Sequence, residues 1–300
     1  MRAVQFTSFG GPEVLRIADV DVPAPGPDEI LVRVAGAGVN QLDTKIRAGA
    51  MPQGRPAAFP LGTGVDAAGA VTAVGPGVTG VAVGDVVFGT GRATMADQAI
   101  LTAWATVPRG VDPVEAGGWG VATETAGRLL TELGLREGTL LVSGASGGVG
   151  SAVVQFAVAR GLTVIGTASA PRHEYLAGLG AIPLAYGAGL ADRVAEVAPH
   201  GVDGAFDLSG AGVIPELVGL VTHPTDVISI ADFTAPGHGA RVSTGATRTM
   251  RPEDGFAEAA ALPGFALRVE RRYALVDIAD AHRQAAGPSA ARMGDRAGSG

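Results

Sequence analysis

The sequence has 300 residues, 47% hydrophobic and 17% charged, with no cysteine and a formal net charge of −7. A chain of this length can bury one large core or two ordinary ones. The lack of cysteine excludes disulfides, thiolate catalysis, iron–sulfur clusters and zinc sites with sulfur ligands. The acidic balance argues against nucleic-acid binding. The chain has no run of about 18 uninterrupted apolar residues, so we expect no membrane span and a cytoplasmic protein.

The first part of the chain, to about residue 110, predicts short β-strands with little helix. Valine-rich runs such as 29–34 and 69–74 alternate with Gly/Pro turns such as 23–27 and 75–77. Strands and turns at this spacing are typical of a small barrel or sandwich. The run 80–88 predicts a further pair of strands around a tight turn.

The pattern changes at Pro113, where helical spacing begins and continues to Leu133. After Gly138, apolar strands alternate with helices, which predicts an α/β fold with a parallel sheet covered on both faces. We expect strands at 139–142, 162–165, 182–185, 202–208 and 226–230, and helices at 149–160, 171–179 and 190–197. Near the end of the chain we expect a strand at 266–270, a helix at 276–284 and a frayed tail over 290–300.

Residues 144–150, with the sequence GASGGVG, join the first strand of this alternating region to its first helix. With 47 glycines in the chain, a glycine pattern alone proves little, and the strand–turn–helix context carries the inference. Glycines let the backbone approach a pyrophosphate, and the helix N-terminus supplies free N–H donors. We therefore interpret this segment as a dinucleotide-binding turn with Gly147, Gly148 and Val149 at the phosphates. A plain tight turn is the alternative.

The end of the next strand bears on the choice of cofactor. A site for NAD places a carboxylate about 20 residues beyond the first glycine, where it binds the ribose 2′-hydroxyl. Residues 166–173 contain no Asp or Glu, whereas Thr167 and Ser169 offer hydroxyls and Arg172 a guanidinium suited to a phosphate. The segment favours NADPH over NADH. A solvated arginine at a helix start is the alternative for Arg172.

Several blocks of the sequence, in this order and spacing, resemble a known family. They are 38–47 (GVNQLDTKIR), 60–69 (PLGTGVDAAG), 83–89 (VGDVVFG), 124–126 (ETA), the glycine turn with Gln155 on its helix, and 166–169 (GTAS). From Met1 to about Gln284, the chain resembles zinc-independent, quinone-oxidoreductase-like members of the medium-chain dehydrogenase/reductase superfamily.

The resemblance implies a GroES-like β-barrel catalytic domain with an inserted Rossmann domain, and NADPH in the cleft between them. The first part of the catalytic domain would be residues 1–115, the NADPH-binding domain 116–262, and the return segment 263–300. A homodimer is also implied, because relatives commonly pair through the sheet of the cofactor domain. The activity implied is metal-independent hydride transfer to a quinone or an α,β-unsaturated carbonyl compound.

Departures from the family pattern are informative. Zinc-dependent relatives have a metal-binding cysteine where this chain has Asn40, and a His-Glu pair where it has Val65 and Asp66. The five histidines are not near one another at metal-ligand spacing, so we predict no metal site. The family's final Gly-Lys-x-Val strand is replaced by residues 288–295, PSAARMGD, which removes the basis for predicting that strand and its cofactor contact.

Three residues of the first block are the catalytic candidates. By resemblance, Asn40 is the donor to a developing oxyanion; a turn-stabilising asparagine is the alternative. Asp43 would orient its neighbours. Lys45, the single lysine of the chain, stands where related quinone reductases often have a tyrosine. It could act as a cationic clamp or a proton donor, or be a solvated lysine.

The remaining candidates come from the resemblance or from positions where strands end. Predicted cofactor contacts are Thr63, Thr123, Thr125, Tyr186, Ser209, Ala231 and Phe233. The aromatic residues Phe9, Trp104 and Trp119 line either a substrate cleft or the core. Two other functions stay open: an enoyl or keto reductase of a biosynthetic pathway acting on a tethered or polycyclic substrate, and an NADPH-binding protein without turnover.

Overall fold

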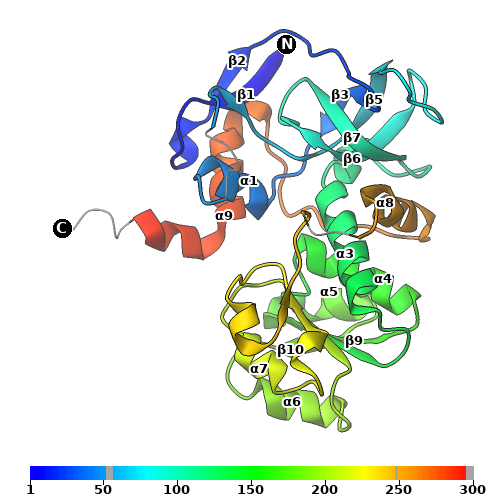
Figure 1. The fold of residues 1–300 in the computed structure, drawn as a ribbon, viewed down its shortest axis with the longest axis vertical. Helices are drawn as coiled ribbons and strands as arrows, with labels where there is room; N and C mark the ends of the chain where they lie inside the picture. Colours follow the sequence, from blue (N-terminus) through cyan, green and yellow to red (C-terminus); the bar gives the residue numbers. More distant parts are fainter. Residues whose placement is uncertain (52–56, 247–248, 295–300) are drawn as a thin grey trace. The chain divides into compact units, whose positions relative to one another are not determined.

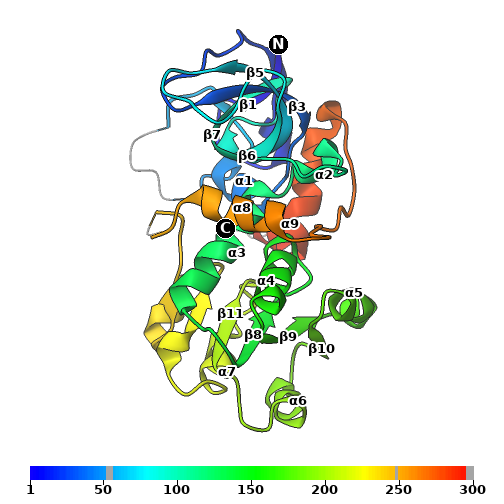
Figure 2. The same ribbon diagram turned by 90° about the vertical axis from the view of Figure 1, so that its right-hand side faces the viewer.

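The computed structural model describes residues 1–51, 57–246 and 249–294. The chain forms two compact units (Figures 1 and 2). The first unit comprises Met1–Val121 and Arg268–Gly300, and the second comprises Ala122–Leu267. The corresponding boundaries expected from the sequence follow residues 115 and 262.

A closed antiparallel barrel forms the centre of the first unit. Its strands are β3 (Ile30–Gly36), β5 (Asp66–Val74), β6 (Val86–Arg92) and β7 (Gln98–Thr106). Alternate apolar residues of these strands fill the barrel, including Ile30, Val32, Val71, Val87 and Leu101, because successive side chains of a strand point to opposite faces. The expected barrel is therefore confirmed.

The strand pair expected at 80–88 is wrong, because only β6 begins there, at Val86. The preceding residues form a turn instead. Gly80 and Gly84 have φ values of +76° and +99°, which glycine adopts without strain. The carboxylate of Asp85 accepts the backbone N–H of Ala82 at 2.8 Å, and only the end of this turn, at Gly84 and Asp85, hydrogen-bonds to Val71 of β5.

A second small sheet and the last helix complete this unit. In the sheet, β1 (Arg2–Phe6) lies between β2 (Arg16–Asp19) and β4 (Leu61–Gly62). Val4 and Phe6 of β1 share a core with Ile278 and Ala281 of α9 (Ile278–Gly294), and α9 also contacts α1 (Gln41–Arg47). The end of the chain thus packs on its beginning.

The strand expected near the end of the chain is wrong. Residues 266–270 form no strand, because the backbone of Ala266 is hydrogen-bonded in both directions to the side chain of Gln155, at 2.9 and 3.2 Å. Residues 290–294, where we expected no regular structure, belong to α9, which continues to Gly294 beyond an interruption at Gly287, whose φ is +66°. The rest of the expected frayed tail, 295–300, lies outside the described residues.

The second unit contains a six-stranded parallel sheet in the order β10–β9–β8–β11–β12–β13. The chain starts at β8 in the middle, adds two strands on one side and then three on the other, which is the doubly wound arrangement. This confirms the expected α/β fold. The strands are β8 (Thr139–Ser143), β9 (Thr163–Ala168), β10 (Ile182–Ala185), β11 (Gly204–Asp207), β12 (Val227–Ser229) and β13 (Arg241–Val242).

Helices cover this sheet. Leu141 of β8 and Ile165 of β9 belong to one apolar core with Leu190 of α6 and Leu217 of α7, and α4 packs on β8 and β9. The helices are α3 (Gly120–Leu133), α4 (Gly148–Ala159), α5 (His173–Gly178), α6 (Leu190–Val197), α7 (Ile214–Val218) and α8 (Pro252–Ala261). The 3₁₀ helices of the two units are Pro12–Val14, Ala170–Arg172, Pro224–Asp226, Ala235–His238 and Leu275–Asp277.

The single helix expected from Pro113 to Leu133 is two helices, α2 (Pro113–Ala116) and α3. The break has a packing cause. A Cβ atom on Gly117 would lie 2.5 Å from the backbone of Gly36 in β3, and one on Gly120 would lie 2.6 Å from the carbonyl oxygen of Gly89 in β6. The chain therefore follows the barrel backbone closely before α3 begins.

Candidate functional site

The glycine turn between β8 and α4 combines a tight bend with an open helix end. Gly144 has φ +81°, and a Cβ atom on Gly150 would lie 2.3 Å from the carbonyl oxygen of Gly144. Gly147 is the N-cap of α4. Gly147 and Gly148 are exposed, and a Cβ atom on Gly148 would meet nothing within 4 Å. Open space therefore stands before the first N–H groups of a 12-residue helix, where an anion binds favourably.

Beside this turn, a buried carboxylate organises the loops that follow β11 and β12. The Oδ1 atom of Asp207 accepts the backbone N–H groups of Ser209 and Gly210, both at 3.0 Å, and the hydroxyl of Ser209 at 2.9 Å. Its Oδ2 atom accepts the hydroxyl of Ser229 at 2.9 Å. Ser229 Oγ in turn accepts the backbone N–H groups of Ala231 and Asp232. Two of the predicted cofactor contacts, Ser209 and Ala231, are therefore fixed by one network.

Strands β9 and β10 lie side by side, so the predicted contacts that follow them are brought to one edge of the sheet. Thr167 is buried, Ser169 is exposed and Arg172 is half-buried. Tyr186, after β10, is 63% exposed. The guanidinium of Arg193 donates to the carbonyl oxygens of the adjoining loop, those of Ala185, Gly187 and Ala188, at 2.9–3.1 Å. Phe233, after β12, is 58% exposed.

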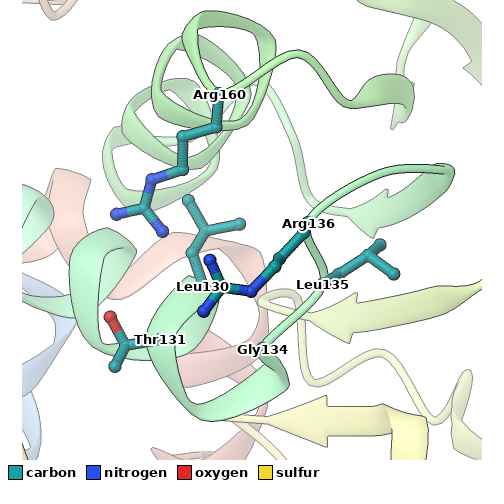
Figure 3. Close-up of a pocket in the computed structure, with 6 residues that line it drawn as sticks. All are labelled: Leu130, Thr131, Gly134, Leu135, Arg136 and Arg160. Carbon is teal, nitrogen blue, oxygen red and sulfur yellow. The ribbon is translucent and has the colours of Figure 1, made fainter.

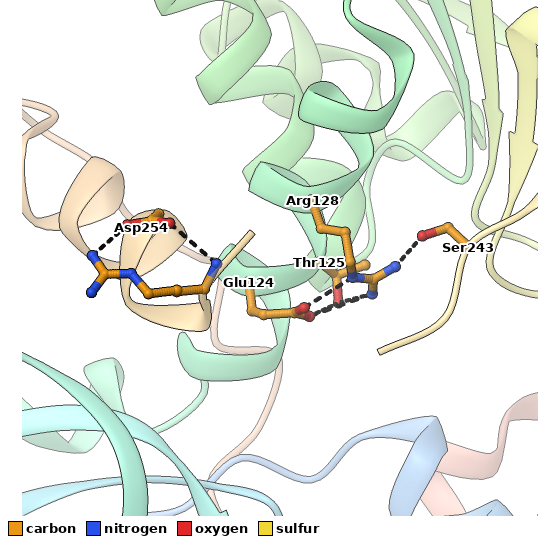
Figure 4. A network of polar contacts seen from close by, with 6 residues as sticks. Glu124, Thr125, Arg128, Ser243 and Asp254 are labelled. Atoms are coloured by element: carbon orange, nitrogen blue, oxygen red, sulfur yellow. Dashed lines mark hydrogen bonds and ion pairs between the residues drawn. The ribbon is translucent and has the colours of Figure 1, made fainter. Parts of the chain in front are cut away.

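Thr123 and Thr125 are buried on α3, beside a buried ion pair (Figure 4). Arg128 Nε lies 2.9 Å from Glu124 Oε1, and the Thr125 hydroxyl donates to Glu124 Oε2 at 3.2 Å. Arg128 also donates to the Ser243 hydroxyl, just after β13. The exposed Asp254, which is drawn in the same view, pairs instead with Arg251 at 3.1 Å. The Thr125 hydroxyl is thus held in a network that ties α3 to the end of the sheet.

In the first unit, Asn40 stands at the start of α1 between two buried carboxyl groups. Its backbone N–H donates to Asp43 Oδ2 at 2.7 Å, and its side-chain Nδ2 donates to Asp66 Oδ2 at 2.9 Å. Asp66 Oδ1 accepts the backbone N–H of Val121 at 2.7 Å. The Asn40 side chain is half-buried, whereas Asp43 and Asp66 are wholly buried.

Burial dominates the electrostatics of both carboxyl groups. Desolvation raises the pKa of Asp66 to about 7, against the hydrogen bonds from Asn40 and Val121, and the nearby Asp43 raises it further. Desolvation also raises the pKa of Asp43 to about 6, against hydrogen bonds from Asn40 and from backbone groups. Two carboxyl groups that titrate near neutral pH flank one amide, an arrangement found at functional sites.

Lys45 and Thr63 lie in the same unit as Asn40. Lys45 is half-buried on α1 and forms no ion pair within the described part of the chain. Thr63 is buried, and its carbonyl oxygen accepts the backbone N–H of Met95 at 3.1 Å.

The aromatic candidates separate into core and surface. Trp119 is buried against Phe88 with ring centroids 5.3 Å apart, and Trp104 packs against the barrel core. Phe9 is 38% exposed and contacts Phe59 at a centroid distance of 5.2 Å. Of the three residues considered for a substrate cleft, Trp119 is therefore a core residue and Phe9 a surface residue.

A cavity of about 390 Å³ lies elsewhere in the second unit (Figure 3). It is lined by Leu130, Thr131, Gly134, Leu135, Arg136 and Arg160. These residues come from the C-terminal ends of α3 and α4 and the approach to β8, so they stand at the edge of the sheet where strands begin. Ligands of such folds bind at the opposite edge, where strands end, and the cavity therefore does not enlarge the candidate site.

Within residues 1–51, 57–246 and 249–294, no three His, Cys, Asp or Glu side chains gather as metal ligands would. Over the same ranges, no helix is both long and apolar enough to cross a membrane.

Sequence reasoning missed four residues that organise the candidate groups: Asp66 in the first unit, and Asp207, Arg128 and Arg193 in the second. In the sequence analysis, Asp66 was named only because Val65 and Asp66 stand where zinc-dependent relatives have a His-Glu pair. Asp207 was detectable as the second of two acidic residues in the predicted strand 202–208, near the end that lies at the candidate edge of the sheet. No sequence signal identified the partners of Arg128 or Arg193.

Several known proteins are similar in sequence to part of this chain. The family described as "Alcohol dehydrogenase GroES-like domain" matches residues 26–128. The quinone oxidoreductase of Rattus norvegicus is 41% identical over 184 residues, which cover 59% of this chain and 55% of that protein. The chain thus spans about half the length of the curated relatives it matches.

Solved structures match over most of the chain. An alcohol dehydrogenase superfamily protein from Novosphingobium aromaticivorans is 32% identical with a TM-score of 0.75, and the match covers 87% of this chain and 86% of that one. A mycobacterial protein solved in complex with NADPH is 27% identical with a TM-score of 0.79, covering 95% and 96% of the two chains.

Proposed function

This chain belongs to the medium-chain dehydrogenase/reductase superfamily, as a zinc-independent, quinone-oxidoreductase-like member, and we propose that it is an NADPH-dependent oxidoreductase. The proposed reaction is metal-independent hydride transfer to a quinone or an α,β-unsaturated carbonyl compound. The rat quinone oxidoreductase and the mycobacterial NADPH complex support this assignment. The homodimer, the cytoplasmic location and the domain limits expected from the sequence belong to the same proposal.

The observation that carries the proposal is the glycine turn, which opens α4 at the edge of the sheet where strands end. Its exposed Gly147 and Gly148, with space beyond Gly148, fit a pyrophosphate held by the first N–H groups of α4. Thr167, Ser169 and Arg172 are assigned to the adenosine 2′-phosphate, because a hydroxyl and a guanidinium both donate to phosphate oxygens. The ordered loops at Ser209 and Ala231 would bind the rest of the cofactor.

Bound NADPH would supply the hydride from its nicotinamide ring. The chain's own contribution is to orient the reactants and to stabilise the oxyanion that develops on the substrate. Asn40 is assigned as the donor to that oxygen. Lys45 is assigned either a cationic contact or the donation of a proton, and Asp43 holds the backbone of Asn40 through its 2.7 Å hydrogen bond.

The decisive experiment is a substrate panel of quinones, enals and enoyl thioesters with NADPH and NADH, after exhaustive chelation of the purified protein. We expect oxidation of NADPH by a quinone or an enal, with much weaker binding of NADH. Asn40→Ala should reduce kcat by about 10²–10³ because an oxyanion donor is lost. Gln41→Ala, an exposed neighbour on α1, should retain the wild-type kcat.

Other outcomes would reassign the protein. Turnover of enoyl thioesters alone would identify a biosynthetic enoyl reductase, and NADPH binding without any turnover would identify a binding protein. Equal affinities for NADPH and NADH would contradict the role of Arg172. Loss of activity after chelation would contradict metal independence.

A further inference from the structure

Asp66 is held rigidly between two hydrogen-bond partners at the start of β5. Its Oδ1 atom faces the backbone N–H of Val121 at 2.7 Å, and its Oδ2 atom faces the Asn40 amide at 2.9 Å. A Cβ atom on Gly38 would lie 2.8 Å from Oδ2, and one on Gly120 would lie 2.9 Å from Oδ1. Glycines on both sides make room for this carboxyl group, and it is wholly buried with both oxygens engaged.

The two partners of Asp66 differ in what they can offer. A backbone N–H can only donate, so Oδ1 must always accept from Val121. The side-chain amide of Asn40 can present either an N–H or its carbonyl oxygen. When Asp66 is ionised, Oδ2 accepts an N–H from Asn40. When Asp66 takes up a proton, that proton must sit on Oδ2, and the Asn40 amide must turn its oxygen toward it.

These two arrangements leave Asn40 with different capacities toward a ligand. Beside the ionised carboxylate, Asn40 gives an N–H to Asp66, and the same side chain also hydrogen-bonds the carboxyl group of Asp43. Beside the protonated carboxyl, the carbonyl oxygen of Asn40 is used by Asp66, and its N–H groups are released from Asp66 as donors. A developing oxyanion needs donors, so the second arrangement is the productive one.

We propose that Asp66 is a positioning residue whose protonation turns the Asn40 amide, so that both N–H groups of Asn40 face the carbonyl oxygen of the substrate. The inference rests on the function proposed above, in which Asn40 stabilises that oxygen. It adds a proton-controlled orientation step that involves a buried residue with no substrate contact of its own.

The surroundings of Asp66 keep its protonated form within the neutral pH range. Burial raises the pKa of Asp66 to about 7, and Asp43 from α1 raises it further. No described cation pairs with Asp66. The charged groups of the surrounding elements are placed as follows: Arg92 of β6 pairs with Glu29, Arg47 of α1 contacts His282, Glu115 of α2 pairs with Arg272, Arg33 of β3 is exposed, and Lys45 of α1 is half-buried.

The orientation of Asn40 can be measured directly, because Asn40 is the single asparagine among the 300 residues. Protein labelled with ¹⁵N-asparagine therefore gives one side-chain NH₂ resonance pair. We expect this pair to shift with two midpoints, near pH 6 for Asp43 and near pH 7 for Asp66, and we expect Asp66→Asn to remove the one near pH 7. A pair that does not change between pH 5 and pH 9 would overturn the proposal. This titration needs neither NADPH nor substrate, so it is independent of the proposed function.

The kinetic test uses Asp66→Asn. Because Val121 still requires an acceptor, the new amide must turn its oxygen to Val121 and its NH₂ to the Asn40 oxygen, which fixes the productive arrangement. Wild-type kcat/KM should fall as the pH rises through the Asp66 titration, whereas Asp66→Asn should show no such fall. In Asp43→Asn the fall of kcat/KM should still occur, but at a lower pH than in the wild type. The reason is that this variant removes the charge that raises the pKa of Asp66.

Two results would refute the positioning role. One is an Asp66→Asn variant that keeps the wild-type pH profile. The other is an Asp66→Asn variant that melts and binds NADPH like the wild type but has lost its activity. If no substrate of the panel is turned over, the proposed function fails, and the NH₂ titration alone decides whether Asp66 controls Asn40.

Discussion

Asp207 has four donors on its two carboxylate oxygens: three from Ser209 and Gly210 in the loop after β11, and one from Ser229 at the end of β12. Hydrogen bonds to a charged group contribute about 1.5–3 kcal/mol each, more than neutral ones. Removal of this acceptor deprives the buried Ser229 hydroxyl and the partly buried donors of Ser209 and Gly210 of their shared partner, and it loosens the loops at Ser209 and Ala231. If these loops bind the cofactor as proposed, Asp207 connects the stability of the sheet edge to cofactor binding.

We expect Asp207→Ala to raise the Kd for NADPH by roughly tenfold or more and to lower the melting temperature. Titration calorimetry and thermal unfolding measure the two effects. Asp207→Asn, which keeps one acceptor oxygen for Ser209 and Gly210, should lie between this variant and the wild type. Asp192→Ala, an exposed carboxylate on α6, is the control. An Asp207→Ala protein that binds NADPH like the wild type would show that these loops do not hold the cofactor.

At the scale of an element, two glycines of α4 have different expected roles. Gly150 is required by packing, and Gly148 is required by the proposed ligand. Gly150→Ala places a Cβ atom 2.3 Å from the carbonyl oxygen of Gly144, so we expect the turn to be forced apart and the melting temperature to fall. Gly148→Ala meets no atom within 4 Å. We expect this variant to retain its stability and to bind NADPH more weakly, because the methyl group occupies the space before the helix.

The same two measurements, melting temperature and Kd for NADPH, separate these outcomes. If Gly148→Ala binds NADPH with unchanged affinity, the N-terminus of α4 is not the pyrophosphate site. If Gly150→Ala melts like the wild type, the close approach of Gly150 to Gly144 does not constrain the turn.

The elements predicted well from the sequence are those that carry their own apolar pattern. Helix α6 has the predicted bounds, Leu190–Val197, and β8 differs from its prediction by one residue. The two-residue strand β13 and the five-residue helix α7 are too short to show a period, and they are stabilised by tertiary packing. The break between α2 and α3 was missed because it depends on the barrel backbone, which is distant in sequence.

For the candidate functional residues, too, what could be predicted depends on how far apart in the sequence the interacting residues are. The glycine turn and the block around Asn40 were recognisable because their residues are close together in the sequence. The bond from Asn40 to Asp66 spans 26 positions and the bond from Ser229 to Asp207 spans 22, and no local pattern indicates either. Both contacts arise from the order of strands in the folded sheets, so the structure was needed to find the residues that orient the candidate groups.

At the scale of the whole molecule, the last segment of the chain belongs to the same unit as the first. A buried contact joins its helix α9 to α1. Arg47 of α1 lies 3.2 Å from His282 Nδ1 of α9, across 235 positions of sequence. His282 is wholly buried. Burial, followed by the charge of Arg47, lowers the pKa of His282 to about 4. The folded protein therefore holds this histidine neutral.

This contact predicts a loss of stability in acid. The pKa of His282 is about 4 when folded, against about 6.5 for an unfolded chain, so between these values the unfolded chain binds more protons. The free energy of unfolding should therefore fall as the pH falls from 6.5 to 4, by about 2 kcal/mol at pH 5. Chemical denaturation at pH 5 and pH 7 measures it. The variant His282→Leu should lack this acid loss.

The difference between wild type and His282→Leu isolates this effect from the buried carboxyl groups. Asp43 and Asp66 have raised pKa values in the folded protein, so their contribution falls as the pH rises and opposes that of His282 in the same range. These groups remain in both proteins, and their effect cancels in the comparison. His223→Leu, at an exposed position, should keep the full acid loss. An equal loss in His282→Leu would assign the acid sensitivity to another part of the molecule.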